Sequence, residues 1–323
     1  MELNITGLSK TYANGVRALD DVTLTIPAGM FGLLGPNGAG KSTLMRTLAT
    51  LQGADHGSVQ LAGLPASAGA GRSGGGSIDV LREQDALRRV LGYLPQDFGV
   101  YPKVSAEDML DHFARLKGLH DKVQRAEAVA GLLRQTNLYD VRRSALGGFS
   151  GGMRQRFGIA QALLGSPQLI IVDEPTAGLD PEERTRFHNL LVEIGEEVIV
   201  LLSTHIVSDV SDLCPNLAIM NKGRVLVSGT PAQLVDALMG RVWTSLVARA
   251  DVEPLRAQHA VISNHLYSGK TQVTVIADTR PAPGFEPAAP TLEDAYFAAI
   301  GGHLLMPQSS PVTEGKLLSA TAL

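Results

Sequence analysis

Short apolar runs of strand length alternate with longer amphipathic runs along most of this chain. Runs that favour strands lie at residues 3–8, 22–26, 31–34, 90–94, 169–172, 198–203, 217–220 and 224–228, and runs that favour helices lie at residues 41–51, 79–89 and 182–194. Alternation of this kind is typical of a largely parallel sheet covered by helices. The pattern therefore predicts an α/β fold.

The remaining segments predict further units. A helical period over residues 106–135 predicts a mainly helical subdomain at about residues 97–165. Weaker strand patterns and a final helix predict a small α+β domain at residues 239–302. Gly and Ser dominate residues 66–78, and Ser, Thr and Pro are frequent in residues 303–323. We expect a flexible surface insertion and a disordered tail, because neither segment can bury enough apolar area to become ordered.

Composition narrows the classes of function. Of the 323 residues, 44% are hydrophobic and 19% are charged, which is typical of a globular protein. The formal net charge of −4 provides no broad cationic surface, so no nucleic-acid partner is expected. The apolar runs are far shorter than the ~20 residues of a membrane-spanning helix. The single cysteine, Cys214, and an N-terminus without the apolar core of a secretory signal both favour the cytosol.

The first candidate site is the segment GPNGAGKST at residues 35–43, which joins a strand-like run to a helix-forming run. Its glycines let the backbone turn successive N–H groups inward at the start of a helix, which forms a cup for an anion. Lys41 can then reach the β- and γ-phosphates of a nucleotide, and the Ser42 hydroxyl can ligate the accompanying Mg²⁺. The predicted nucleotide-binding residues of this segment are Gly35, Asn37, Gly38, Ala39, Gly40, Lys41, Ser42 and Thr43.

A second candidate site lies at the end of the apolar strand in LIIVDEP, residues 169–175. Asp173 is placed to bind Mg²⁺ through water, and Glu174 is a carboxylate suited to polarise an attacking water. A carboxylate base beside a phosphate cup implies hydrolysis. The structural alternative is a buried strand with two acids at its exposed end.

A third segment, FSGGMRQR at residues 149–156, places a serine and two glycines at the start of a helix, which forms a second anion-binding helix terminus. This segment resembles the signature motif of the ATP-binding cassette (ABC) ATPases, and its position just before LIIVDEP is that of the family. The resemblance covers about residues 1–235, and we place a first domain at residues 1–238. It implies ATP and Mg²⁺ as ligands.

The resemblance also implies a P-loop NTPase fold of a particular build: a mostly parallel core sheet, an antiparallel β subdomain and the helical subdomain. Phe149 and Met153 differ from the Leu and Gln that are commoner at those positions of the motif. The phosphate-facing residues are retained as Ser150, Gly151 and Gly152.

Four more residues acquire roles through the resemblance. Gln96 resembles the glutamine that contacts Mg²⁺ and water, and His205 the switch histidine near the γ-phosphate. Asp180, in AGLD, resembles the aspartate that contacts the opposing nucleotide, and Tyr12 resembles the aromatic residue that stacks on adenine. Taken singly, a Gln or His at a strand end is more often a polar cap, and Tyr12 could be a half-exposed strand residue.

The family geometry implies that two cassettes pack head to tail, with each ATP between the phosphate loop of one copy and Ser150, Gly151 and Gly152 of the other. Closure then depends on ATP, and hydrolysis reopens the pair. The expected partners are a second copy or a homologous cassette, together with separate transmembrane permease subunits. The expected location is the cytoplasmic face of the cell membrane, as a peripheral protein.

Three functions remain open at this point. The overall pattern, including LEDAYFAAIGG near the C-terminus, is similar to ATP-binding subunits of bacterial drug and lipid exporters. A soluble ABC ATPase that acts on another macromolecular complex is the alternative, although the chain carries neither a second phosphate loop nor long heptad arms. A cassette that senses ATP without hydrolysing it would lack the catalytic carboxylate, whereas Glu174 is present.

Overall fold

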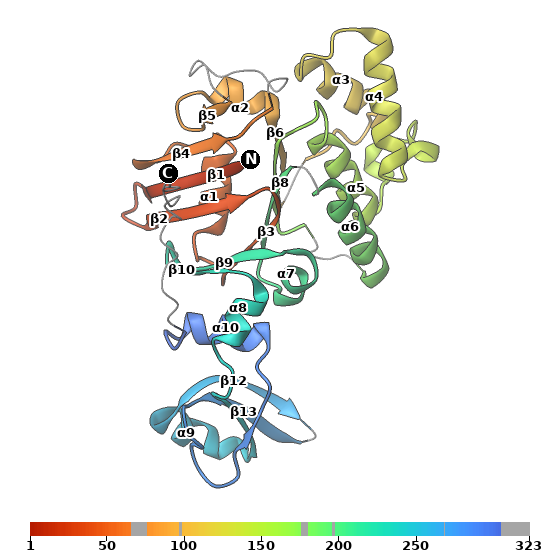
Figure 1. Cartoon of the computed structure of the whole chain (residues 1–323). Helices are drawn as coiled ribbons and strands as arrows, with labels where there is room; N and C mark the ends of the chain where they lie inside the picture. Colours follow the sequence, from red (N-terminus) through yellow and green to blue (C-terminus); the bar gives the residue numbers. More distant parts are fainter. Residues whose placement is uncertain (66–75, 97–98, 176–179, 196–197, 268, 305–323) are drawn as a thin grey trace, which may run out of the picture.

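A six-stranded sheet forms the centre of the molecule (Figure 1). The computed structural model describes residues 1–65, 76–96, 99–175, 180–195, 198–267 and 269–304. The strand order is β10 (Arg224–Gly229), β9 (Asn216–Asn221), β3 (Gly29–Leu34), β8 (Ile199–Thr204), β7 (Leu169–Asp173) and β6 (Leu91–Leu94). All neighbours are parallel except β10 and β9. The predicted α/β fold is therefore confirmed.

The strands of this sheet are apolar without alternation because both faces are covered. Every residue of β7 and of β8 is buried. On one face, Phe31 and Leu201 pack against α1 (Lys41–Leu48) and a second sheet. On the other face, Leu34 and Leu202 pack against α6 (Pro181–Ile194) and α7 (Val207–Leu213). A continuous apolar run is the expected sequence of a strand buried on both sides.

The second sheet is antiparallel and has the order β2 (Arg17–Pro27), β1 (Glu2–Thr11), β4 (His56–Ala62) and β5 (Ser77–Asp79). Its inward side chains, such as Leu3 and Ile5, share one core with α1. The prediction of a helix over residues 79–89 is wrong at its start. Asp79 pairs with β4, its carboxylate accepts hydrogen bonds from the N–H groups of Leu81 and Arg82, and α2 begins only at Gln84 (Gln84–Val90).

The helical subdomain consists of α3 (Ala106–Leu116), α4 (Lys122–Gln135) and α5 (Gly151–Ala162), which lie together beside the central sheet (Figure 1). Ser105, Asp121 and Ser150 cap the three helices through side-chain oxygens. The subdomain has its own core, in which the Phe157 side chain is fully buried. In the described part of the chain, no helix has the length and apolar character needed to cross a bilayer.

The C-terminal unit is a small antiparallel sheet with the order β12 (Ala260–Tyr267), β13 (Lys270–Ile276), β11 (Val242–Val247) and β14 (Glu286–Pro287), and α9 (Val252–Gln258) packs on one face. The last helix, α10 (Leu292–Ile300), packs against α7 and α8 (Pro231–Asp236) of the large domain and also contacts β12 of this sheet (Figure 1). Ala295 and Tyr296 are buried in the core of that domain.

The packing of α10 against the large domain affects where the boundary between the two domains is drawn. The expected domain of residues 239–302 contains α10, yet α10 shares one core with α7 and α8 of the first domain as well as with Val242 and Ile276 of the small sheet. The predicted insertion lies mostly outside the described residues, at 66–75, and so does the predicted tail from residue 305 onward. The boundaries themselves stay a prediction.

Candidate functional site

The segment GPNGAGKST forms the turn between β3 and α1, as the sequence predicts. Gly38 and Gly40 have φ values of 80° and 103°, which lie in the left-handed region that favours glycine. The turn is held from outside: the Gly223 N–H donates to Ala39 O at 2.9 Å, and a Cβ on Gly35 would lie 2.5 Å from Met220 O. These contacts support the curled backbone of the loop, which leads into the N-terminus of α1, where anions bind favourably.

Replacing Gly40 with Ala is expected to disrupt this loop. The new Cβ would lie 2.4 Å from Ala18 O at a φ of 103°, so steric overlap and backbone strain act together. We expect a loss of stability of about 2 kcal/mol or more and a clear loss of ATP affinity. Thermal melting and fluorescence titration with an ATP analogue measure the two effects. Gly53→Ala is the matched control, because a Cβ there meets no atom within 4 Å; equal effects in both variants would contradict the interpretation.

The Lys41 side chain lies buried inside the loop. Its Nζ donates to Gly35 O at 2.7 Å and to Pro36 O at 3.3 Å, and lies 3.9 Å from Oε1 of Glu174. Burial lowers the pKa of Lys41, and the negative charges of Glu174 and Asp173 oppose this shift. The structure thus places an ammonium group between the phosphate loop and the two acids at the end of β7.

Glu174 is the residue at which distant parts of the chain meet. Its carboxylate accepts a hydrogen bond from Nε2 of Gln96 at 3.3 Å, and its Oε1 lies 3.3 Å from Nδ1 of His205. Its backbone has a φ of 47°, which costs a non-glycine residue about 1–3 kcal/mol, and its N–H is held by Ser203 O at 2.9 Å. Strain of this kind is concentrated at functional sites, and here it turns the carboxylate towards Lys41.

Asp173 is buried beside Glu174, with only 3% of its surface exposed. Burial raises its pKa, and the neighbouring Ser203 and Ser42 hydroxyls oppose the rise. Its Oδ1 has no hydrogen-bond partner among the described residues. A buried oxygen without a partner next to the Ser42 hydroxyl is an oxygen-rich set that suits Mg²⁺ or a water bound to it. The residues present therefore fit the metal that accompanies a nucleotide.

Tyr12 lies at the edge of the same site. Its hydroxyl lies 3.1 Å from Oγ1 of Thr43 and donates to Oε1 of Gln52 at 3.2 Å, which links the end of β1 to α1. Tyr12 is 37% exposed. An exposed aromatic ring next to the phosphate loop can stack on a base, and the structure therefore brings the predicted aromatic residue to the site.

Ser150 and Asp180 lie at the starts of two helices that touch each other. The Ser150 hydroxyl accepts from the Met153 N–H at 3.2 Å at the start of α5, and Oδ1 of Asp180 accepts from the Glu183 N–H at 2.9 Å at the start of α6. A Cβ on Gly152 would lie 2.5 Å from the Glu183 carboxylate, so the absence of a side chain at Gly152 lets the Glu183 side chain lie against the start of α5. Both predicted residues are therefore helix caps.

Two features of the site are missing from the sequence prediction. Ser203 contributes both a carbonyl that fixes the Glu174 backbone and a hydroxyl near Asp173. Arg184 on α6 donates through Nε to Oδ1 of the buried Asp209 on α7 at 2.7 Å, which ties together the helices that follow Asp180 and His205. In the sequence, the only indication of Ser203 is its place at the end of an apolar strand. Nothing in the sequence indicates the pairing of Arg184 with Asp209.

Comparison with known proteins agrees with this geometry. The family model described as "ABC transporter" matches residues 19–177. The chain is 34% identical, over 284 residues, to the daunorubicin/doxorubicin resistance ATP-binding protein DrrA of Streptomyces peucetius, with coverage of 85% of this chain and 81% of that protein.

A second relative is longer. The chain is 31% identical, over 318 residues, to the probable multidrug ABC transporter ATP-binding protein YbhF of Escherichia coli (strain K12) and spans about half of it: 93% of this chain is covered and 52% of that protein.

The fold comparison leads to the same family. A structure described as the ATP-binding subunit of an ABC transporter superposes with a TM-score of 0.62 at 28% identity, covering 73% of this chain and 92% of the other. This chain thus combines the fold of known cassettes with the phosphate loop at residues 35–43, the segment at residues 149–156 and the acids Asp173 and Glu174. The chain belongs to the ABC transporter family, as an ATP-binding protein with the cassette fold.

Proposed function

We propose that the chain hydrolyses ATP and that two cassettes close around the nucleotide to drive a membrane transporter. The observation that supports hydrolysis most strongly is the position of Glu174, whose carboxylate lies near Lys41, Gln96 and His205. Lys41 would hold the β- and γ-phosphates. Glu174 would accept a proton from the attacking water, and His205 and Gln96 would keep the carboxylate oriented towards that water.

Ser42, Asp173 and Gln96 are the residues that we propose to hold Mg²⁺. The ion, when bound, would neutralise negative charge on the phosphates. The backbone N–H groups of Gly38, Gly40 and Lys41 would contribute donors from the loop, and Tyr12 would stack on the adenine ring.

The second half of the site would come from another copy of the chain. The start of α5 presents Ser150, Gly151 and Gly152 at a helix N-terminus, where anions bind favourably. Because this terminus belongs to the helical subdomain and not to the phosphate loop, we propose that it contacts the nucleotide of the opposing cassette. Asp180, at the adjacent start of α6, would lie in the same seam.

A groove between the helical subdomain and the core offers a place for the membrane partner. A cavity of about 390 Å³ lies between the ends of α1 and α3, and its lining includes Leu51, Leu116, Phe113 and Tyr93. The Leu51 and Leu116 residues are 62% and 71% exposed. Apolar side chains exposed at one hollow mark protein contact sites, so we propose that a cytoplasmic segment of a permease subunit docks here.

Charge replacements in this groove are expected to uncouple the subunit from its membrane partner. Leu116→Glu would place a charge in the apolar contact, and co-purification with the permease from solubilised membranes should be lost. The ATP turnover of the isolated chain should stay within about twofold of the wild type, since surface substitutions away from the site change little. Val123→Glu on α4 is the control, because Val123 is 66% exposed and lies outside the groove lining. Retention of the permease by Leu116→Glu would contradict the proposed docking site.

The kind of transporter is inferred from the relatives. Two of them carry names that refer to multidrug transport and to resistance against daunorubicin and doxorubicin. We propose export of drug-like molecules, with the chain bound peripherally at the cytoplasmic face of the membrane.

A further inference from the structure

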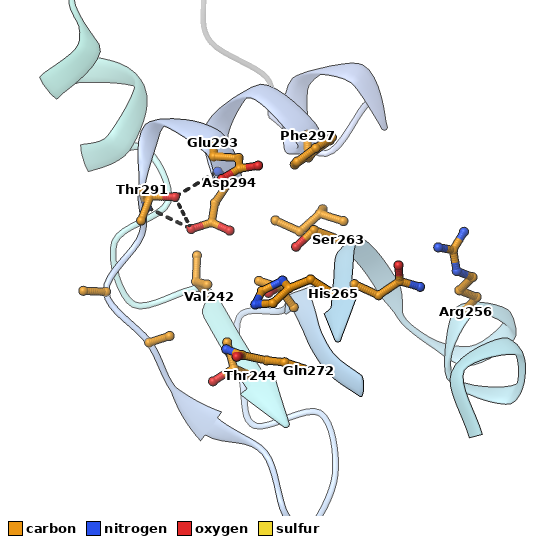
Figure 2. A pocket seen from close by; sticks show the side chains of 15 residues that line it. Val242, Thr244, Arg256, Ser263, His265, Gln272, Thr291, Glu293, Asp294 and Phe297 are labelled. Carbon is orange, nitrogen blue, oxygen red and sulfur yellow. Dashed lines mark hydrogen bonds between the residues drawn. The ribbon is translucent and has the colours of Figure 1, made fainter. Parts of the chain in front are cut away.

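The C-terminal unit contains a cavity that the ATPase function does not use. It has a volume of about 520 Å³ and lies between the face of the small sheet opposite α9 and the start of α10. Figure 2 shows Thr244, Ser263, His265 and Gln272 of the sheet on one side and Glu293, Asp294 and Phe297 of α10 on the other. Cavities of this size are typical of small-molecule sites.

A row of hydroxyl groups crosses the floor of this cavity. Thr244 on β11 is paired in register with Thr274 on β13, and Thr274 is paired with Ser263 on β12. The next row on the same face pairs His265 with Gln272. Residues that are directly opposite in neighbouring strands point to the same side, so five polar side chains from three strands face one hollow.

None of these five side chains has a hydrogen-bond or ion-pair partner among the described residues. Thr274 is 4% exposed, whereas Thr244, Ser263 and Gln272 are half-buried and His265 is exposed. The opposite face of β13 is apolar and packed: Val273 and Val275 are fully buried against α9 and Phe285. A polar group that is buried without a partner is unfavourable, and buried polar groups are usually satisfied. None of the five polar side chains has such an orphaned buried atom, so the row opens to the hollow, where a ligand can bond it.

The charges around the cavity indicate the kind of ligand. Glu293 forms no ion pair among the described residues and lies at the wall contributed by α10 (Figure 2). Asp294 adds a second carboxylate, whose Oδ2 caps α10 through the Thr291 N–H. Among the described residues of the lining, Arg256 is the only arginine, and its Nε lies 3.8 Å from Oε1 of Glu253. The wall next to the hydroxyl row is thus acidic, and Phe297 adds an apolar ring.

We propose that this cavity binds a small hydroxylated amine, such as an amino sugar, with its hydroxyl groups on the Thr244, Thr274 and Ser263 row and its ammonium group at Glu293. The same ligand would bridge the small sheet and α10. Because α10 packs against α7 and α8, an occupied site would add a contact between the C-terminal sheet and the ATPase domain to the core that Val242 and Ile276 already share with α10. The proposal is independent of the direction and substrate of transport.

The test uses the full chain and two probes, glucosamine and the larger multiply aminated sugar kanamycin, with glucose as the neutral counterpart. Titration by NMR or calorimetry, at a pH below the pKa of the sugar amine, should show saturable binding of at least one amine and weaker binding of glucose. Glu293→Gln should weaken the amine about tenfold and Thr274→Val about threefold or more, because a charged hydrogen bond and a neutral one are lost.

Thr271→Val is the matched control. Thr271 lies three residues before Thr274 in β13, and because side chains alternate along a strand, it lies on the opposite face. It should bind the amine as the wild type does. Hydrogen exchange gives the location: binding should slow exchange in β12, β13 and α10. The proposal fails if neither amine binds, if glucose binds equally well, if all variants bind alike, or if the protection lies elsewhere.

Discussion

Replacing Glu174 with Gln is expected to lower ATP turnover by at least about 100-fold, which is the effect of removing a general base. The amide keeps the shape of the side chain, and its one oxygen can still accept from either Gln96 or His205. ATP affinity should change much less than turnover, since the phosphate loop and Lys41 are untouched. Phosphate release measures the first quantity and fluorescence titration with an ATP analogue the second.

A control on a neighbouring helix separates this effect from a general loss of charge. Glu182→Gln removes a carboxylate in the first turn of α6, where the group is 76% exposed and pairs with Arg186. Its turnover should stay within about twofold of the wild type. Full activity of Glu174→Gln would show that the base has been assigned to the wrong residue.

The second large effect is expected at the start of α5. Ser150→Asp preserves the helix cap, because aspartate accepts the same backbone N–H bond as serine. It also places a negative charge where the opposing nucleotide would bring its phosphates. Repulsion between two charges at contact distance should lower both ATP-dependent pairing and turnover by at least about tenfold. Binding of ATP to a single chain should persist, since Lys41 lies elsewhere.

Two controls accompany this variant. Ser150→Asn has nearly the size of the aspartate variant and also caps helices well, but it adds no charge, so its loss of turnover should be clearly smaller. Thr230→Asp makes the same kind of change at the cap of α8. The proposed seam would be refuted if Ser150→Asp paired and hydrolysed ATP as well as Thr230→Asp does.

Most of the core follows from sequence because its signals are local. The strand at β8 and the turn at Gly35–Thr43 are each specified by a few neighbouring residues: a two-faced apolar run, and glycines at left-handed positions. The end of β7 is similar, since Asp173 and Glu174 follow directly from the apolar run. These features can be predicted from the neighbouring residues in the sequence, without knowing which parts of the chain pack against them.

Features that depend on distant partners were harder to predict. The start of α2 is set by pairing of Asp79 with β4, which no local period reveals. The apolar residues of α10 look like part of a small separate domain, but they also pack against α7 and α8 of the large domain. The cavity beneath α10 depends on the registers of three strands, so its row of hydroxyls becomes visible only when Thr244, Thr274 and Ser263 lie side by side.

The central claim is that ATP joins two copies of the chain, with Lys41 of one and the Ser150 helix start of the other on the same nucleotide. Light scattering of Glu174→Gln at saturating Mg·ATP measures this directly, because bound ATP should persist in a variant that hydrolyses it slowly. The account predicts a particle of twice the mass of one chain, which is lost on adding the Ser150→Asp change. A single-chain mass at every protein concentration tested would contradict it.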